Sequence, residues 1–201
     1  MKKYNQDNIQ EVIDAFNHHE ILAFPTDTVY GVGVKFGNLN DLNRLKKAKN
    51  RVETKPIPVM VSTIEQLESF CQLTLREKKI ISLFLPGALT LILPLKEGIN
   101  KEFTNGNPTI AIRMPEDDFV LNVISQTGPL FVTSANQSGQ ATSLTYEDAL
   151  EQLPNIDGIV FGKCKALQAS TIVDCTKEEL AILRQGPISL QQLNNAIKKD
   201  I

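Results

Sequence analysis

The residues best suited to chemistry in this sequence are hydroxyl and arginine side chains that stand where apolar runs end. The first cluster, residues 24–33, reads Phe-Pro-Thr-Asp-Thr-Val-Tyr-Gly-Val-Gly and follows the apolar run from Ile21 to Phe24. Its threonine hydroxyls can donate and accept hydrogen bonds, and its glycines allow close backbone approach and positive φ. A strand that ends in this way indicates the rim of a polar ligand pocket, although a self-contained turn would have the same composition.

Further polar clusters adjoin other apolar runs. Arg113 follows the run 110–112, the hydroxyl-rich segment 133–139 follows the run 130–132, Ser170 precedes 171–174, and Arg184 follows 181–183. Because ligands of open α/β sheets bind near strand ends, we expect these clusters to share one pocket. Taken singly, each has a simpler explanation, such as a surface ion pair for Arg113 or plain turn chemistry around Ser138.

The pocket expected from these clusters has several cations, many neutral donors and little carboxylate. Such a set suits a polyphosphate and a small zwitterion, and it does not suit the carboxylate pair of a glycosidase. The two histidines, His18 and His19, are adjacent in a predicted helix and read as solvated surface. Cys71, Cys164 and Cys175 are widely spaced, form no CxxC motif and suit reduced cytosolic thiols. The sequence therefore offers few histidine and cysteine residues from which a catalytic triad or a zinc site could form.

The charge of the chain is uneven. The net charge of −2 argues against a protein that coats nucleic acid by bulk electrostatics. Residues 44–55 nevertheless carry six basic side chains against Glu53 alone, a local balance of 6 − 1 = +5. The six are Arg44, Lys46, Lys47, Lys49, Arg51 and Lys55. This stretch predicts either an anion site or a solvated basic face. Neither GxxxxGKS/T nor GxGxxG occurs, so a bound nucleotide would be held by side-chain cations and strand-end hydroxyls.

The remaining pattern predicts one α/β domain over residues 1–201, with a twisted, mixed parallel and antiparallel open sheet and flanking helices. Helical spacing predicts helices over 8–19 with an Asp7/Gln10 capping box, through 39–45, from 62, from 74 through 84, over 119–124, over 145–153 and from 189. Strands are predicted at 21–24, 57–61, 89–95, 109–113, 130–133, 158–161, 171–173 and 181–183, with Pro58 suggesting an edge strand or a bulge. The chain has neither a membrane-spanning apolar run nor a signal-peptide pattern, so we expect a cytoplasmic protein without a membrane partner.

Seven segments, in this order, resemble the YrdC-like family of threonylcarbamoyl-adenylate synthases. They are Pro25–Gly31, Lys49–Arg51 with Lys55-Pro56, Leu85–Thr90, Ala111–Pro115, Ser134–Gly139, Ser170–Asp174 and Leu183–Gly186. The resemblance covers about residues 8–190, and seven segments in register are highly specific. It implies the short, single-domain form of the family, without a C-terminal second domain.

The resemblance implies a nucleotidyltransferase that converts L-threonine, bicarbonate and ATP into threonylcarbamoyl-AMP and pyrophosphate. This is the first step toward N6-threonylcarbamoyladenosine at position 37 of tRNA, and proteins that transfer the threonylcarbamoyl group would act downstream. The residues implied for ATP are Lys49, Arg51, Lys55, Thr109, Ser134, Asn136 and Arg184, with Asn136 supporting the loop of Ser134. Those implied for threonine are Thr28, Arg113, Thr133 and Ser170, with Arg113 on the carboxylate. Mg²⁺ is expected on the phosphates; no metal ligand, nucleophile or general base is assigned.

The sequence departs from the family pattern at a few positions. Val52 follows Arg51 where proline is common, Met60 stands where many members have histidine, and Glu116-Asp117 replace a His-Pro pair. These departures leave threonine specificity open. Two alternatives remain: a paralogue that adenylates a different carbamate, and a non-catalytic module that binds double-stranded RNA or tRNA through the basic stretch.

Overall fold

The computed structural model describes residues 1–51 and 56–198. Within these ranges the chain forms ten strands, seven α-helices and two 3-10 turns. The strands are β1 Lys2–Asn5, β2 Leu22–Phe24, β3 Gly31–Lys35, β4 Val59–Met60, β5 Leu89–Pro94, β6 Thr109–Arg113, β7 Leu130–Ser134, β8 Gly158–Phe161, β9 Thr171–Asp174 and β10 Ala181–Arg184. The helices are α1 Ile9–Asn17, α2 Leu39–Ala48, α3 Ile64–Phe70, α4 Leu75–Phe84, α5 Asp118–Thr127, α6 Tyr146–Gln152 and α7 Leu190–Lys198, and the 3-10 turns are η1 Gln6–Asn8 and η2 Lys101–Thr104.

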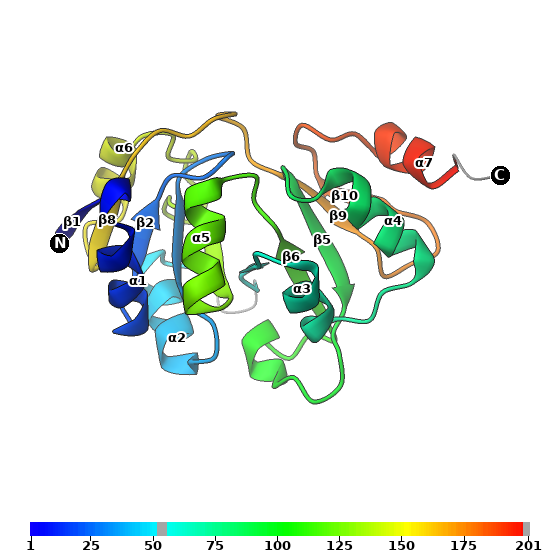
Figure 1. The fold of residues 1–201 in the computed structure, drawn as a ribbon, viewed down its shortest axis with the longest axis horizontal. Helices are drawn as coiled ribbons and strands as arrows, with labels where there is room; N and C mark the ends of the chain where they lie inside the picture. The colour runs from blue at the N-terminus through cyan, green and yellow to red at the C-terminus, as the bar shows by residue number, and fades with distance from the viewer. Residues whose placement is uncertain (52–55, 199–201) are drawn as a thin grey trace.

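All ten strands belong to one sheet, in the order β1-β8-β2-β3-β7-β4-β6-β5-β9-β10. The pairs β1–β8, β2–β8, β4–β6 and β5–β9 are parallel. The other pairs are antiparallel, so the expected mixed sheet is confirmed. The N-terminal strand lies at one end of the sheet and the strands leading to the C-terminus lie at the other (Figure 1).

Helices pack on both faces of the sheet, and strand residues point alternately to one face and to the other. On one face, Leu22 and Phe24 of β2 and Val132 of β7 pack with the apolar sides of α1 and α5. These two helices contact each other and lie over the β2–β3–β7 part of the sheet (Figure 1). On the other face, Ala23 and Phe131 belong to a larger core that includes buried side chains of α2, α3 and α4.

Helix starts agree with the sequence pattern except at α1 and α3; the helix expected from residue 62 has Thr63 as its cap and begins at Ile64. The expected capping boxes Thr74/Glu77 and Thr145/Asp148 are both present and begin α4 and α6. The box expected at Asp7 and Gln10 is wrong. The Asp7 amide donates to the Asn5 side chain at 3.2 Å and begins a 3-10 turn, so α1 starts only at Ile9.

One strand prediction needs correction, and two strands of the structure were not predicted. β4 is not an edge strand, because it pairs with β6 on one side and β7 on the other. Pro58 is compatible with this interior place since it precedes the strand and offers only its carbonyl, which accepts from the Val132 amide at 3.0 Å. β1 and β3 were not predicted. β1 buries only Tyr4 and so lacks a hydrophobic pattern, and the two glycines of β3 are residues typical of turns.

The two glycines of β3 allow this strand to pack closely against β7. Neither glycine has a positive φ, so backbone conformation is not the reason for glycine at these positions. A Cβ on Gly33 would lie 2.5 Å from the Phe131 carbonyl oxygen, whereas one on Gly31 would meet the Val132 side chain at 3.0 Å. None of the helices within the described ranges is long and apolar enough to cross a membrane.

Gly33→Ala should destabilise the fold by about 1–3 kcal/mol, because the clash is with backbone that cannot rotate away. Urea unfolding of this variant and of Gly31→Ala checks the claim, since the side chain facing Gly31 can move. A loss of stability for Gly33→Ala no larger than for Gly31→Ala would contradict it.

Candidate functional site

The floor of the candidate site is the face of β5, β6 and β9 opposite the larger core. Leu89, Leu91 and Leu93 of β5 point into that core, so the alternate residues Thr90 and Ile92 face the other way. In register, Thr90 is opposite Ile172 of β9, and Ile92 is opposite Ala111 of β6. These side chains line a pocket of about 560 Å³.

Most of the predicted site residues line this one pocket. They are Thr28, Arg51, Arg113, Thr133, Ser134, Ser170 and Arg184. The expectation that they share one pocket is therefore confirmed, but they do not meet at a single sheet edge. Met60 of β4 is in register with both Arg113 and Leu130, so Thr133 and Ser134 lie farther along β7. The pocket extends across the sheet face, and two of its arginines, Arg113 and Arg184, each lie beside a hydroxyl group.

Arg113 is the centre of the pocket's electrostatics. Its side chain is 6% exposed and its guanidinium donates to Asp27 Oδ1 at 2.7 Å and to Thr28 Oγ1 at 2.8 Å. Burial lowers the pKa of Arg113, and the Asp27 carboxylate opposes that shift. Thr26 fixes the turn beneath this pair, because its hydroxyl donates to the Val29 carbonyl and accepts from the Thr28 amide. The loop between β2 and β3 is thus held against β6.

A second polar group joins β5, β9 and β10. Arg184 donates to the Ser170 carbonyl and hydroxyl, both at 3.0 Å. The Ser170 hydroxyl also lies 2.9 Å from that of Thr90. Burial and, to a smaller extent, the positive charge of Arg113 lower the pKa of Arg184. Two guanidinium groups that repel each other across a pocket favour an anion between them.

The other predicted residues are placed differently. Lys49 is 1% exposed, and its ammonium donates to the Ser134 and Asn136 carbonyls instead of lining the pocket. Asn136 donates to Gln137 O and Gln140 O at 2.9 and 3.0 Å, so it braces its own loop. Thr109, at the start of β6, is not among the pocket residues. Lys55 lies outside the described residues.

The departures from the family pattern separate into two kinds. Met60 lines the pocket beside Arg113, so an apolar thioether stands where a polar contact was expected. Glu116 is exposed, and Asp117 begins α5 by accepting from the Val120 amide at 3.1 Å. Neither acidic residue is part of the described pocket lining. Val52 lies outside the described residues.

The sequence reasoning missed Asp27 and Thr90. Asp27 was given no role within the first polar cluster, yet it forms the buried ion pair with Arg113. Thr90 lies between Leu89 and Leu91, so it faces away from the core to which the alternate leucines point. A polar residue at such a position of a predicted strand is the signal that could have identified it.

The pocket can bind oxyanions and zwitterions but offers no protein metal site in the described part of the chain. Its described lining contains three arginines and several hydroxyls and no carboxylate, and residues 1–51 and 56–198 hold no cluster of metal-ligating side chains. Positioning and charge neutralisation are the chemistry that such a lining supports.

Lys49 should make stability depend on pH. Burial, helped by the positive charge of Arg51, lowers the pKa of Lys49 from 10.5 to about 7. Between these values the unfolded chain binds a proton that the folded chain has lost, so the free energy of unfolding should rise with pH over this window. The slope is at most about 1.4 kcal/mol per pH unit.

The measurement is urea unfolding from pH 7 to pH 10 for the wild type and Lys49→Met. The stability of the wild type relative to the variant should increase with pH. Exposed Lys47→Met controls for the loss of a lysine on the same segment. A wild-type advantage that stays constant or shrinks as pH rises would contradict the buried, largely neutral Lys49.

The chain is similar to proteins of one family. A model of the Sua5/YciO/YrdC family, described as "Telomere recombination", matches residues 14–186. The chain is 34% identical over 198 residues to a threonylcarbamoyl-AMP synthase of Bacillus subtilis, covering 96% of this chain and 57% of that protein. It is 31% identical over 189 residues to a putative threonylcarbamoyl-AMP synthase of Mycobacterium leprae, covering 92% and 86%.

Among solved structures, the fold is similar to P. abyssi Sua5 complexed with L-threonine. The TM-score is 0.90 at 28% sequence identity, and the match covers 98% of this chain and 60% of that one. The chain therefore spans little more than half the length of the Bacillus and Pyrococcus proteins that it resembles.

Proposed function

The chain belongs to the Sua5/YciO/YrdC family, and we propose that it is a threonylcarbamoyl-AMP synthase. In this proposal it is a nucleotidyltransferase that joins L-threonine, bicarbonate and ATP into threonylcarbamoyl-AMP, with release of pyrophosphate and water. The product would serve proteins that transfer the threonylcarbamoyl group to tRNA. We also propose a cytoplasmic location, which the free thiols of the three cysteines suit.

The observation that carries the proposal is the fixed, buried guanidinium of Arg113 at the end of a hydroxyl-lined pocket. Asp27 and Thr28 hold this guanidinium in place. In the proposal, the threonine carboxylate binds at Arg113, and Thr28, Thr133 and Ser170 lie within the same pocket for its polar groups. The P. abyssi Sua5 structure, which contains L-threonine, supports a threonine site in this fold.

ATP would occupy the remainder of the pocket. Arg51 and Arg184 supply positive charge and Ser134 a hydroxyl. Lys49 would act indirectly, because it holds the carbonyls of the Ser134–Asn136 loop. Thr109 and Lys55 stay predictions as nucleotide contacts.

The reaction requires little side-chain chemistry. The threonine amine and bicarbonate combine to a carbamate with loss of water. A carbamate oxygen then bonds to the α-phosphorus of ATP while the bond to the leaving pyrophosphate breaks. Holding the anions in line and neutralising developing charge supplies most of the rate in such transfers. The arginines and hydroxyls of the pocket suit both tasks.

Mg²⁺ belongs to the proposal as a companion of ATP. The described pocket lining has no carboxylate to hold it, so the ion would arrive on the phosphate oxygens and no protein ligand is assigned.

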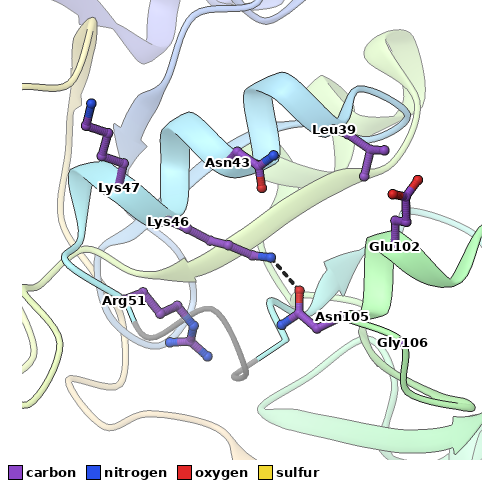
Figure 2. A pocket seen from close by; sticks show the side chains of 8 residues that line it. All are labelled: Leu39, Asn43, Lys46, Lys47, Arg51, Glu102, Asn105 and Gly106. Atoms are coloured by element: carbon purple, nitrogen blue, oxygen red, sulfur yellow. Dashed lines mark hydrogen bonds between the residues drawn. The ribbon is translucent and has the colours of Figure 1, made fainter.

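The RNA-binding alternative is not favoured. Its described cations are divided between interior and surface: Lys46 bonds to Asn105 (Figure 2) and Lys49 is buried, while the exposed Arg44 pairs with Asp157 at 2.8 Å. These side chains do not form a continuous solvated face. The paralogue alternative rests on Met60, which lines the pocket beside Arg113.

The test of the function is incubation with ATP, bicarbonate and L-threonine. We expect pyrophosphate and an adenylate that appear only when threonine is present. Pyrophosphate release that another amino acid supports as well as threonine does would favour the paralogue.

Arg113→Ala should cost about 2–5 kcal/mol in kcat/KM for threonine, because it removes a buried charge that faces the substrate. Arg113→Lys keeps the charge but loses the paired geometry, and should also raise the KM for threonine. Arg44→Ala is the matched control, since it removes an arginine–aspartate pair outside the pocket. Unchanged kcat/KM and KM for threonine in both Arg113 variants would contradict the assignment of the threonine site.

A further inference from the structure

Three polar side chains meet on the floor of the pocket. Thr90 belongs to β5, Ser170 directly precedes β9, and Arg184 ends β10. These three strands are neighbours in the sheet. Thr90 and Ser170 are each 3% exposed, and all three residues line the pocket. We call them the hydroxyl–arginine group.

Strand register places this group next to Arg113. Leu91 of β5 is opposite Ile112 of β6 in an antiparallel pair, so Thr90, one residue before Leu91, comes opposite Arg113, one residue after Ile112. Ser170 lies on the other side of Thr90, beside the second guanidinium. The two hydroxyls are therefore on the floor between two cations, which is where an oxyanion would be held.

The hydroxyl hydrogens of the group are not all used inside the protein. The Arg184 guanidinium can only donate, and it donates to Ser170 Oγ at 3.0 Å. The contact of 2.9 Å between Ser170 Oγ and Thr90 Oγ1 uses one of the two hydroxyl hydrogens. Within residues 1–51 and 56–198, no other oxygen accepts from either hydroxyl. One O–H donor is left over at a buried position, whereas buried donors in proteins nearly always have an acceptor.

The neighbouring Thr171 shows how a purely structural hydroxyl differs. Its Oγ1 donates to the Ile188 carbonyl at 2.7 Å and accepts from the Gly186 and Ile188 amides, both at 3.0 Å. Its hydrogen and both lone pairs are occupied, and it is not among the pocket residues. The pair of Thr90 and Ser170 lines the pocket and keeps one donor for a ligand.

An anion above the pair determines which hydroxyl carries the remaining hydrogen. Arg184 already occupies one lone pair of Ser170 Oγ. If Thr90 donates to the second lone pair, the Ser170 hydrogen has only the pocket to point into. The reverse direction would turn an unused lone pair of Ser170 toward the anion, which is repulsive. The first arrangement aims the Ser170 O–H and the guanidinium at the same ligand.

We propose that Thr90 is a positioning residue that acts through Ser170. Its hydroxyl donates to Ser170 Oγ and thereby turns the Ser170 hydrogen toward an oxygen of the threonine carboxylate. This role rests on the proposed function, in which Arg113 receives that carboxylate and Ser170 contacts threonine. Loss of the Thr90 hydroxyl should weaken threonine binding and leave the later chemical steps unchanged.

The experiment measures threonine-dependent pyrophosphate release and calorimetric binding of L-threonine. Thr90→Val keeps the shape of the side chain and removes its donor. We expect KM and Kd for threonine to rise about three- to tenfold, the effect of one hydrogen bond, while kcat stays within about twofold of the wild type. Thr90→Ser restores the hydroxyl and should recover the wild-type values. Thr90→Ala removes the same donor and guards against misfolding of the valine variant.

Two further variants separate positioning from a general effect on the fold. Thr127→Val changes a buried threonine outside the pocket and should leave KM and Kd unaltered. In a Ser170→Ala background, Thr90→Val should cause no further loss of threonine affinity, because the hydroxyl through which it acts is gone.

Unchanged KM and Kd in both Thr90→Val and Thr90→Ala would overturn the role of Thr90. Equal losses with and without the Ser170 hydroxyl would overturn it as well. Pyrophosphate release by the wild type without threonine dependence would contradict the proposed function, whereas the binding measurements would still decide the role of Thr90. A wild type that neither binds nor uses threonine would overturn both.

Discussion

The buried contact of Arg113 with Asp27 and Thr28 is the interaction on which the candidate site depends. It joins β6 to the loop between β2 and β3, two segments that are far apart in the strand order. Removing both charges from water is costly, so such a pair is weak evidence for added stability. Its consequence is geometric. The position of the guanidinium is set by three acceptors: Asp27, Thr28 and the Gly87 carbonyl. The pocket is therefore shaped around a cation that is held away from solvent.

The unequal cover of the sheet explains why a pocket exists beside that contact. Strand residues alternate between faces, and the core face of β5, β6 and β9 is filled by leucine, isoleucine and valine. On the opposite face, α1 and α5 pack over β2, β7 and their neighbours, while Thr90, Ala111 and Arg113 line a cavity. One sheet thus serves as a core wall along part of its face and as the floor of a binding site along the rest. Small and polar residues at the alternate positions make the difference.

Local patterns predicted most elements, and the failures have specific causes. β3 was not predicted because Gly31 and Gly33 are typical of turns. In the structure Gly33 is needed for packing, since a Cβ there would clash with the backbone of β7. β1 was not predicted because only Tyr4 of this strand is buried. Its strand conformation depends on parallel pairing with β8, which is distant in sequence. Lys49, which the family resemblance implies for ATP, supports the Ser134 loop from inside. A charged residue in a motif does not by itself reveal which way its side chain points.

The sequence alone determined the class of fold, the order of most strands and helices, and the kind of chemistry available. Hydrophobic periodicity, helix caps and the choice of arginine and hydroxyl residues are local properties, and they are readable without coordinates. Only the tertiary structure decided that the polar clusters meet across a sheet face and not at one edge, and that Asp27 is the partner of Arg113. It also decided that Thr90 of β5 meets Ser170 and, through it, Arg184 of β10. These depend on register and on contacts between distant segments, which no local pattern encodes.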